Sequence, residues 1–267
     1  MTDAPAPPVP GQPVWAELFT ADAERARAFY PAVVGWGCTE PDPQLGGYAN
    51  FTIDGTPDGG WIAGLMGHPG DAAGSPLASA WTVYLHVDDV HATVARARAA
   101  GAPVIVEPMQ VADLGWFAQV VDPSGAPVGA RQPGAHRGFA AVRVPGGPYW
   151  LELHTASAFD QTVAFYEAVF GWRTAPLEGA PFPYRRLVDD AGAELAGVMD
   201  ASGWAGATST WQVYWMVDDL DAAVAAVEAG GGTVVDAPHA TPYGRLATLR
   251  DPSGAGFKLA ASVAEPA

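Results

Sequence analysis

Carboxylates, imidazoles and aromatic rings recur at alternate positions of four strand-like segments. Successive side chains of a strand point to opposite faces of a sheet, so alternate residues share one face. The intervening residues, among them Leu18, Val83, Leu153 and Val213, are aliphatic and suit a core face packed under helices. The other face carries aromatic and polar residues, which are the candidates for a ligand site: Trp15, Glu17 and Phe19; Thr82, Tyr84 and His86; Trp150, Glu152 and His154; Gln212, Tyr214 and Met216.

This combination of side chains suits a flat, partly polar organic molecule. Aromatic stacking contributes on the order of 0.5–1.5 kcal/mol per ring pair beyond the burial of area. A carboxylate such as Glu17 or Glu152 prefers a cationic or hydrogen-bond-donating guest, because an unpaired buried charge is costly. Three further aromatic residues are candidates for the rims of the sites: Trp116, Tyr184 and Tyr243.

The same residues also have structural interpretations, which the sequence leaves open. Trp15 and Trp150 suit core packing as well as ligand stacking, and both glutamates suit a carboxylate that accepts hydrogen bonds from a tyrosine or a backbone amide. His86 and His154 are equally consistent with satisfied strand histidines and with acid–base groups. Core packing is the favoured interpretation for four other tryptophans: Trp36, Trp81, Trp172 and Trp211.

The chain repeats itself, and this repeat organises the elements that carry these residues. The segment Trp15 to Ala21 returns as Trp150 to Ala156, and the later anchors return at offsets of 129 to 136 residues. They are Ala-Phe-Tyr at 28 and 164, Gly-Trp at 35 and 171, Val-Asp-Asp at 87 and 217, and Asp-Pro-Ser-Gly at 122 and 251. A nearly constant offset over so many anchors indicates a duplication. Asp-Pro-Ser-Gly itself predicts a turn, with no chemistry assigned to it.

Within the first half, local signals predict two βαβββ modules. A strand at 12–20 precedes a helix over 22–34, which Thr20 or Asp22 can cap, Gly35 can end and Pro31 should kink or shorten. A second helix over 89–100 has Asp88 as its expected cap and Gly101 as its stop. The remaining strands are expected at 36–39, 47–53, 61–66, 80–87, 103–106, 115–121 and 127–131.

The second half repeats this order, which predicts an α+β fold of four βαβββ modules. Residues 1–131 form the first expected domain and 147–267 the second, each with two modules. The segment 132–146, which is rich in proline and glycine, is the expected linker.

Four such modules with Phe-Tyr…Gly-Trp after the first helix and Asp-Pro-Ser-Gly before the last strand resemble the vicinal oxygen chelate superfamily. This group contains glyoxalase I, extradiol dioxygenases and bleomycin-resistance proteins. The resemblance covers nearly the whole chain and is closest to tandem glyoxalase-like proteins of actinobacteria. It implies curved sheets around two open cups, with the polar and aromatic strand faces inside. The resemblance does not determine the activity, because the superfamily contains both enzymes and binding proteins.

The resemblance also places the positions at which metal-dependent members hold a divalent ion. The first-strand positions correspond to Trp15, Thr82, Trp150 and Gln212, and the last-strand positions to Gly64, Gly129, Gly197 and Lys258. Of these residues only Gln212 is a plausible ligand. We therefore expect no metal and no other cofactor, and we include Lys258 among the residues of the ligand site.

Composition narrows the function classes. The chain has 267 residues, 49% of them apolar and 16% charged, which indicates a globular protein. A net charge of −16 argues against nucleic acid and anionic membranes as partners. One cysteine, Cys38, fits a reducing cytoplasm, and we expect no secretion signal or membrane span. No phosphate loop or nucleophile elbow appears, and Cys38 has no histidine near it, so nucleophilic catalysis has no support.

The leading expectation is a metal-free binder of small molecules. The resemblance to the antibiotic-binding members of the superfamily implies an aromatic natural product as the ligand, with an amine-bearing antibiotic such as an anthracycline as an example. The protein's role would be sequestration, self-resistance or assistance to a partner biosynthetic enzyme. The first alternative is a metal-independent enzyme that uses Glu17 or Glu152 as general base and a histidine or tyrosine as acid. A metal-dependent lyase or dioxygenase and a degenerate structural protein are further alternatives, and a homodimer stays open.

Overall fold

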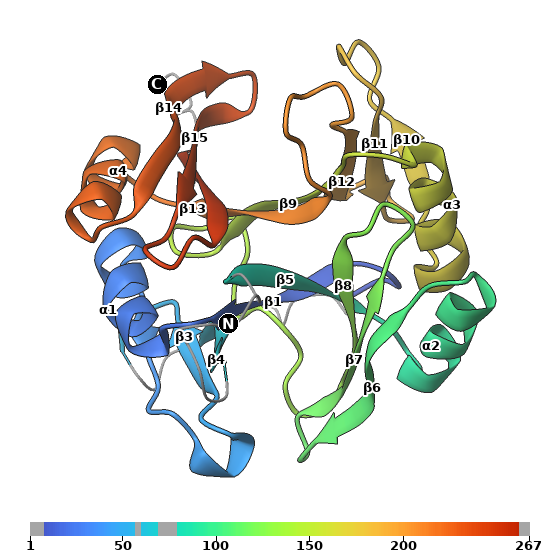
Figure 1. The fold of residues 1–267 in the computed structure, drawn as a ribbon, viewed down its shortest axis with the longest axis horizontal. Coiled ribbons are helices and arrows are strands. Elements are labelled where there is room, and N and C mark those ends of the chain that lie inside the picture. Colours follow the sequence, from blue (N-terminus) through green and yellow to red (C-terminus); the bar gives the residue numbers. More distant parts are fainter. Residues whose placement is uncertain (1–7, 57–59, 69–78, 262–267) are drawn as a thin grey trace. The chain divides into compact units, whose positions relative to one another are not determined.

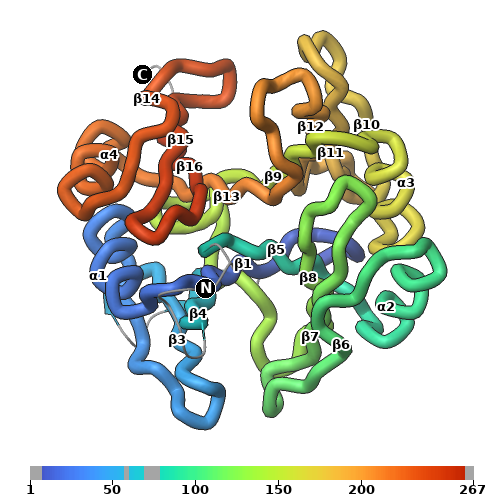
Figure 2. Tube along the Cα trace, viewed as in Figure 1, coloured from blue at the N-terminus to red at the C-terminus, as the bar shows by residue number. Residues whose placement is uncertain are grey.

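The computed structural model describes residues 8–56, 60–68 and 79–261. Its strands form two eight-stranded open sheets, one from each half of the sequence, in the order β2-β3-β4-β1-β5-β8-β7-β6 and β10-β11-β12-β9-β13-β16-β15-β14 (Figure 1). The expected α+β architecture of two tandem glyoxalase-like domains, four βαβββ modules in all, is thereby confirmed. Each helix follows the first strand of its module along the chain (Figure 2).

The elements of the first half lie close to their predicted positions. The helices are α1 (Ala23–Val34) and α2 (Val90–Ala99), with a short 3-10 helix at Pro43–Leu45. The strands are β1 (Pro13–Thr20), β2 (Gly37–Cys38), β3 (Ala49–Thr52), β4 (Trp61–Gly67), β5 (Ala80–His86), β6 (Val104–Val111), β7 (Gly115–Val121) and β8 (Pro127–Pro133).

The second half repeats this series. Its helices are α3 (Phe159–Phe170) and α4 (Leu220–Ala229). Its strands are β9 (Pro148–Thr155), β10 (Thr174–Pro176), β11 (Tyr184–Val188), β12 (Glu194–Asp200), β13 (Thr210–Met216), β14 (Thr233–Thr241), β15 (Gly244–Arg250) and β16 (Gly256–Ala261). The structure describes no helix that is long and apolar enough to cross a membrane.

The ends of α1 and the start of α2 follow local capping chemistry. Asp22 accepts a hydrogen bond from the Arg25 amide at 2.9 Å, and Gly35 ends α1 with a φ of 78°. Pro31 lies within α1, which continues to Val34, so the helix is not shortened at the proline. For α2 the expected cap was wrong by one residue. Asp89, not Asp88, accepts from the Ala92 amide, because only a side chain at the last non-helical position reaches the amide three residues ahead.

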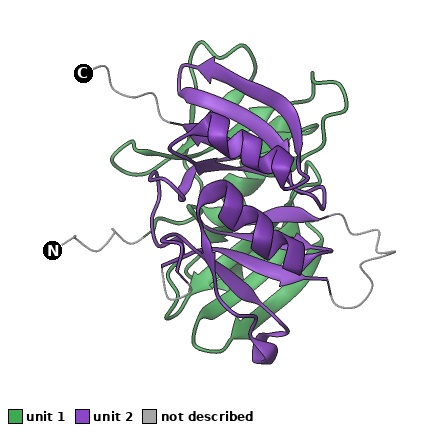
Figure 3. Ribbon diagram, turned by 90° about the vertical axis from the view of Figure 1, so that its left-hand side faces the viewer, with its two compact units in different colours: residues 1–14, 83–137, 152–211 green, residues 15–82, 138–151, 212–267 purple. Residues whose placement is uncertain are grey.

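Contact density divides the chain into two compact units that do not follow the halves of the sequence (Figure 3). Unit 1 contains residues 1–14, 83–137 and 152–211, with α2 and α3 in contact. Unit 2 contains residues 15–82, 138–151 and 212–267, with α1 and α4 in contact. Each unit therefore combines one module from each half. The division of the chain at a linker over 132–146 stays a sequence prediction.

The two repeated motifs meet inside each unit. In unit 2 the Tyr30 hydroxyl donates to Asp251 at 3.1 Å and accepts from the Trp81 indole at 3.0 Å. The Asp251 carboxylate also accepts from the backbone amides of Ser253 and Ala255. Burial raises the pKa of Tyr30 well above its usual value and also raises the pKa of Asp251. The Phe-Tyr motif of the first half is thus hydrogen-bonded to the Asp-Pro-Ser-Gly turn of the second.

Unit 1 repeats this network with the halves exchanged. The Tyr166 hydroxyl donates to Asp122 at 3.0 Å and accepts from the Trp211 indole at 3.1 Å. The Trp172 ring stacks on Tyr166, with centroids 4.4 Å apart. The core interpretation of Trp36, Trp81, Trp172 and Trp211 is confirmed, since each is at most 4% exposed.

Candidate functional site

A cluster of buried polar side chains in unit 1 surrounds Glu152. Its Oε1 lies 2.7 Å from Nε2 of His154, and its Oε2 accepts a hydrogen bond from the Tyr184 hydroxyl at 2.6 Å. The register explains this grouping. Glu152 is paired across the sheet with Gly197, while His154, Met199 and Tyr184 form the next row, so all of them share one face. The sheet therefore brings Tyr184, predicted as a rim residue, next to Glu152 and His154, which were predicted together on one strand face.

Burial makes these hydrogen bonds consequential. Glu152 and His154 are each 7% exposed, and a carboxylate removed from water needs strong hydrogen-bond donors. An ionised carboxylate only accepts, so Nε2 of His154 carries the hydrogen in this contact. In the neutral ring, Nδ1 then holds the lone pair. Within the described part of the chain, we find no hydrogen bond to Nδ1 of His154.

Two aromatic residues that the sequence analysis missed border this cluster. Trp204, in the loop between β12 and β13, is 49% exposed and contacts the His154 ring edge-on at 5.6 Å. Phe182, just before β11, lies 6.2 Å from Trp204 and 6.5 Å from Tyr184, ring centroid to centroid. Strand alternation makes no prediction for loop residues, so it could not identify Trp204 or Phe182. The sequence feature that could have identified Trp204 is that it is a large aromatic residue in a loop of small residues, Ser202 to Gly206.

The corresponding strands of unit 2 carry a different arrangement. The Trp15 indole, 2% exposed, donates to the Tyr48 hydroxyl at 3.2 Å and lies 5.9 Å from the Phe139 ring. Glu17 is paired in register with Gly64, as Glu152 is with Gly197. Phe19 occupies the place of His154 and contacts the His68 ring at 4.0 Å. The two duplicated strands have therefore diverged from each other.

Strand β5 contributes Tyr84 and His86 to unit 1. The Tyr84 hydroxyl accepts from the Gln119 side chain at 2.7 Å, and its ring contacts Phe117 at 6.2 Å. Nε2 of His86 lies 3.3 Å from the exposed Asp88 carboxylate, and burial lowers the pKa of His86. The neighbouring Thr82 belongs to unit 2 and is half-buried.

In unit 2, strand β13 pairs its tyrosine with a lysine. Nζ of Lys258 donates to the Tyr214 hydroxyl at 2.8 Å and lies 4.7 Å from the centre of its ring. Gln212 and Met216, two residues to either side of Tyr214, are half-buried. Lys258 thus brings a positive charge to this part of the strand face, where its counterpart Gly129 has no side chain.

Three predicted residues remain: Trp116, Tyr243 and Trp150. Trp116 packs edge-on against His91 of α2 at 5.0 Å, so it does not share the face of Tyr84, whereas Phe117 does. Tyr243 is 59% exposed at the turn before β15, and its carbonyl accepts from the Tyr149 hydroxyl. Trp150 is half-buried, with the Arg143 guanidinium 6.0 Å from its ring centre.

The positions that hold a metal in the superfamily do not fit one here. A Cβ added at Gly64 would lie 1.9 Å from the Tyr48 oxygen, and one added at Gly129 would lie 2.0 Å from the Tyr84 ring. Aromatic side chains thus occupy the space of two potential ligands, while Lys258 brings a cation to a third position. Among the described residues, no group of three or more His, Cys, Asp or Glu side chains is placed to hold a metal.

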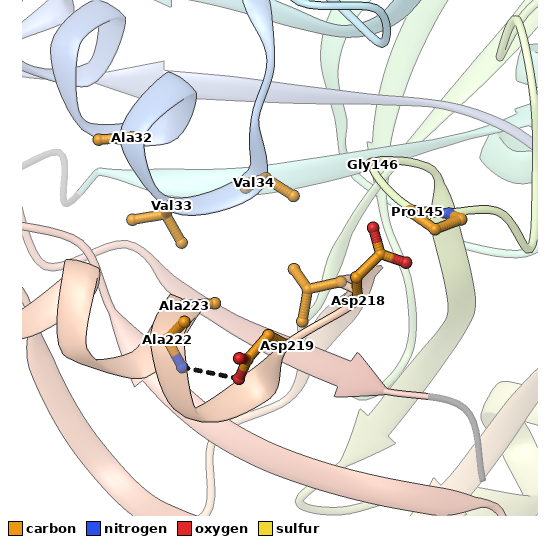
Figure 4. A pocket seen from close by; sticks show the side chains of 10 residues that line it. Ala32, Val33, Val34, Pro145, Gly146, Asp218, Asp219, Ala222 and Ala223 are labelled. Atoms are coloured by element: carbon orange, nitrogen blue, oxygen red, sulfur yellow. Dashed lines mark hydrogen bonds between the residues drawn. The ribbon is translucent and has the colours of Figure 1, made fainter. Parts of the chain in front are cut away.

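A separate cavity of about 220 Å³ in unit 2 does not coincide with any predicted site. It lies between the C-terminal end of α1 and the N-terminal end of α4 (Figure 4). Its walls are mainly small aliphatic side chains, with Asp218 and Asp219 at one side. Asp219 is engaged in capping α4 through the Ala222 amide at 3.0 Å, so this cavity offers little free polar chemistry.

Comparison with known proteins identifies the family. Residues 12–129 match the Glyoxalase/Bleomycin resistance protein/Dioxygenase superfamily, and residues 151–260 match the Glyoxalase-like domain. The chain is 37% identical over 252 residues to "Putative glyoxylase CFP32" of Mycobacterium tuberculosis, covering 93% of this chain and 94% of that protein. The chain belongs to the glyoxalase/bleomycin-resistance/dioxygenase superfamily.

Other members of the superfamily extend the comparison. "Anthracycline biosynthesis protein DnrV" of Streptomyces peucetius is 34% identical over 265 residues, covering 94% of this chain and 93% of that protein. The Mn(II)-bound glyoxalase from Novosphingobium aromaticivorans has a TM-score of 0.63 at 16% identity, covering 96% of this chain and 83% of that chain. A catechol 2,3-dioxygenase has a TM-score of 0.62 at 14% identity, with coverages of 97% and 91%. The solved structures share the superfamily's fold with this chain.

Proposed function

We propose that this protein binds an aromatic natural product without the metal of its superfamily. The observation that carries the proposal is the Glu152 cluster bordered by Trp204 and Phe182. A planar guest gains apolar contact from the two rings, and the buried carboxylate favours a cationic or hydrogen-bond-donating group on it. An amine-bearing polycycle such as an anthracycline has both features, and a similar protein is named for anthracycline biosynthesis.

The biological role that we propose is sequestration, self-resistance or assistance to a biosynthetic enzyme, in the cytoplasm. The negative charge of the chain supports a cationic ligand over nucleic acid or an anionic membrane surface. The single cysteine is consistent with a reducing compartment.

Fluorescence titration with an anthracycline, and with the same compound lacking its amino sugar, tests the binding site. Trp204→Ala should weaken both ligands by about 1–3 kcal/mol, from lost stacking and lost apolar contact. Glu152→Gln should weaken only the amine-bearing compound, because the amide keeps the shape and removes the charge. Ile105→Ala and Glu228→Gln, which change exposed residues of other elements, serve as controls. Unaltered binding of both compounds by both site variants would place the ligand elsewhere.

The metal part of the proposal has its own test. Elemental analysis of the purified protein should find no stoichiometric zinc, nickel, iron or manganese, and a chelator should leave the melting temperature unchanged. About one tightly held ion per chain would overturn the metal-free proposal, whatever the titrations give.

A further inference from the structure

Glu152 and His154 have the geometry of an oriented base. The carboxylate holds Nε2 of the imidazole at 2.7 Å, and the Tyr184 hydroxyl fixes the other carboxylate oxygen at 2.6 Å. A carboxylate that holds one ring nitrogen sets the tautomer and leaves the opposite nitrogen as the proton acceptor. The same carboxylate stabilises the imidazolium that forms when this nitrogen takes a proton. Trp204 and Phe182 border the pair with apolar surface.

The first strands of the other three modules lack this arrangement among the described residues. Phe19 and Met216 replace the histidine on β1 and β13. His86 on β5 has a carboxylate neighbour, but Asp88 lies 3.3 Å away with 83% of its side chain exposed. An exposed carboxylate is a weakly held partner, because water competes for it and the long contact restrains the ring little. Of these four strands, β9 therefore carries the histidine that is held most firmly by a buried carboxylate.

We propose that His154 is a general base that moves a proton on a bound carbonyl compound, with Glu152 and Tyr184 as positioning residues. The substrate class is a planar aromatic ketone whose acidic C–H lies between the ring and the carbonyl group. Its ring lies against Trp204 and Phe182, and the C–H faces Nδ1 of His154. This inference goes beyond ligand binding but uses the same cluster.

The step balances without a co-reactant. Nδ1 takes the proton from carbon, the C–H electron pair forms the C=C bond, and the carbonyl π pair moves to oxygen to give the enolate. The aromatic ring delocalises the carbanionic charge, and Glu152 pairs with the imidazolium. The imidazolium then returns a proton to carbon or to oxygen, so the net result is isomerisation, or hydrogen exchange when the same carbon is reprotonated.

The assignment of the base to His154 rather than Glu152 follows from the hydrogen bonds. Both carboxylate oxygens already accept from side-chain donors, and proton transfer to either oxygen would break one of these contacts. The sequence-based alternative of Glu152 as base and a histidine as acid is thereby reversed in this proposal.

Deuterium exchange of 2-tetralone tests the proposal. The C1 protons of this ketone lie between a benzene ring and a carbonyl group, and their loss in D2O can be followed by proton NMR. The wild-type protein should accelerate exchange above the rate in buffer, and the acceleration should saturate with ketone concentration.

His154→Ala should lower the saturated rate at least about 100-fold, the lower end of the range for general acid–base catalysis. Added imidazole should restore part of the lost rate, which lost folding would not permit. His239→Ala, an exposed histidine on β14, is the control.

The positioning residues give a second readout. Glu152→Gln should lower the saturated rate and leave the half-saturating concentration nearly unchanged, and imidazole should not restore it. Tyr184→Phe should cause a smaller fall of the same kind. Exchange at the buffer rate, or an unaltered rate in folded His154→Ala and His154→Gln variants, would overturn the proposal. If anthracycline binds and no exchange occurs, the proton-transfer proposal is overturned and the binding proposal is retained. If exchange depends on His154 and anthracycline does not bind, the binding proposal is overturned and the proton-transfer proposal is retained.

Discussion

At the scale of residues, the chain uses its buried carboxylates in two ways. Asp251 accepts from the amides of its own turn and from Tyr30, so it holds a turn against a helix. Glu152 accepts from His154 and Tyr184, which come from two strands of one sheet face. The first arrangement stabilises the fold, and Asp122, the equivalent of Asp251 in the repeat, makes the same contact with Tyr166 in unit 1. The second is not repeated on the equivalent strand of unit 2, β1, where Phe19 replaces the histidine.

The Tyr30 hydroxyl gives a prediction about stability. Tyr30→Phe leaves the buried Trp81 indole and one Asp251 oxygen without this partner, which should cost about 1–3 kcal/mol of unfolding free energy at pH 7. Urea unfolding measures this loss. Tyr166→Phe should behave alike in unit 1, and Tyr243→Phe, at an exposed turn, should cost nothing measurable.

The sign of the pH dependence follows from Asp251. Burial raises its pKa, so the folded chain holds a proton between the unfolded value, about 3.9, and the folded pKa. Its contribution to stability therefore falls as pH rises through that window. The Tyr30 hydrogen bond opposes this by lowering the pKa, that is, by stabilising the ionised form. The cost of Tyr30→Phe should thus be smaller at pH 4 than at pH 7, and an equal cost at both would contradict this account.

At the scale of elements, two glycines make room for tyrosine side chains against the sheet. Gly129 of β8 lies under the Tyr84 ring, and Gly64 of β4 lies under the Tyr48 hydroxyl. Because β8 is paired in parallel with β5, and β4 with β1, each glycine sits beside a residue of the candidate binding face. The absence of side chains at these two positions leaves the space that the aromatic side chains occupy.

Gly129→Ala tests this close packing. The new Cβ would lie 2.0 Å from the Tyr84 ring, so the ring or the strand must move, and overpacking of this kind costs about 1–3 kcal/mol. Gly256→Ala on β16 is the matched control, because nothing lies within 4 Å of the added Cβ. Thermal or urea unfolding should separate the two variants. Similar stabilities would mean that Tyr84 has room to turn away.

Sequence patterns predicted these elements well and their loops poorly. Alternation on β9 placed Glu152 and His154 on one face, and the register then joined them to Tyr184. No such period applies to Phe182 and Trp204, whose positions depend on how two loops close over the strand ends. Trp116 shows the other limit. It lies on a predicted strand, but the register turns it towards α2 and gives its place to Phe117.

At the scale of the whole molecule, the duplication explains the composition of the compact units. Tyr30 of the first half needs Asp251 of the second, and Tyr166 of the second half needs Asp122 of the first. The repeat itself was visible in the sequence. That each Phe-Tyr motif contacts the Asp-Pro-Ser-Gly turn of the other half was not, because one sequence gives spacing along the chain but no partner in space.

The last prediction follows from this exchange of partners. A fragment of residues 1–137 keeps both Tyr30 and Asp122 but lacks Asp251, the native partner of Tyr30. Since Asp122 and Asp251 are equivalent residues of the repeat, Asp122 of a second copy can take the place of Asp251. The fragment should therefore form a homodimer with closed two-fold symmetry, because each copy offers one tyrosine and one turn. Size-exclusion chromatography with light scattering measures its mass.

Tyr30→Phe in this fragment should shift the population towards an unfolded monomer, since folding and association are then linked by mass action. The intact chain with the same substitution should stay folded, because there the two motifs are joined covalently and pair at a much higher effective concentration. A fragment that is a stable, folded monomer would show that one half of the sequence can bury Tyr30 without a partner, and the units would then not depend on the exchange of motifs.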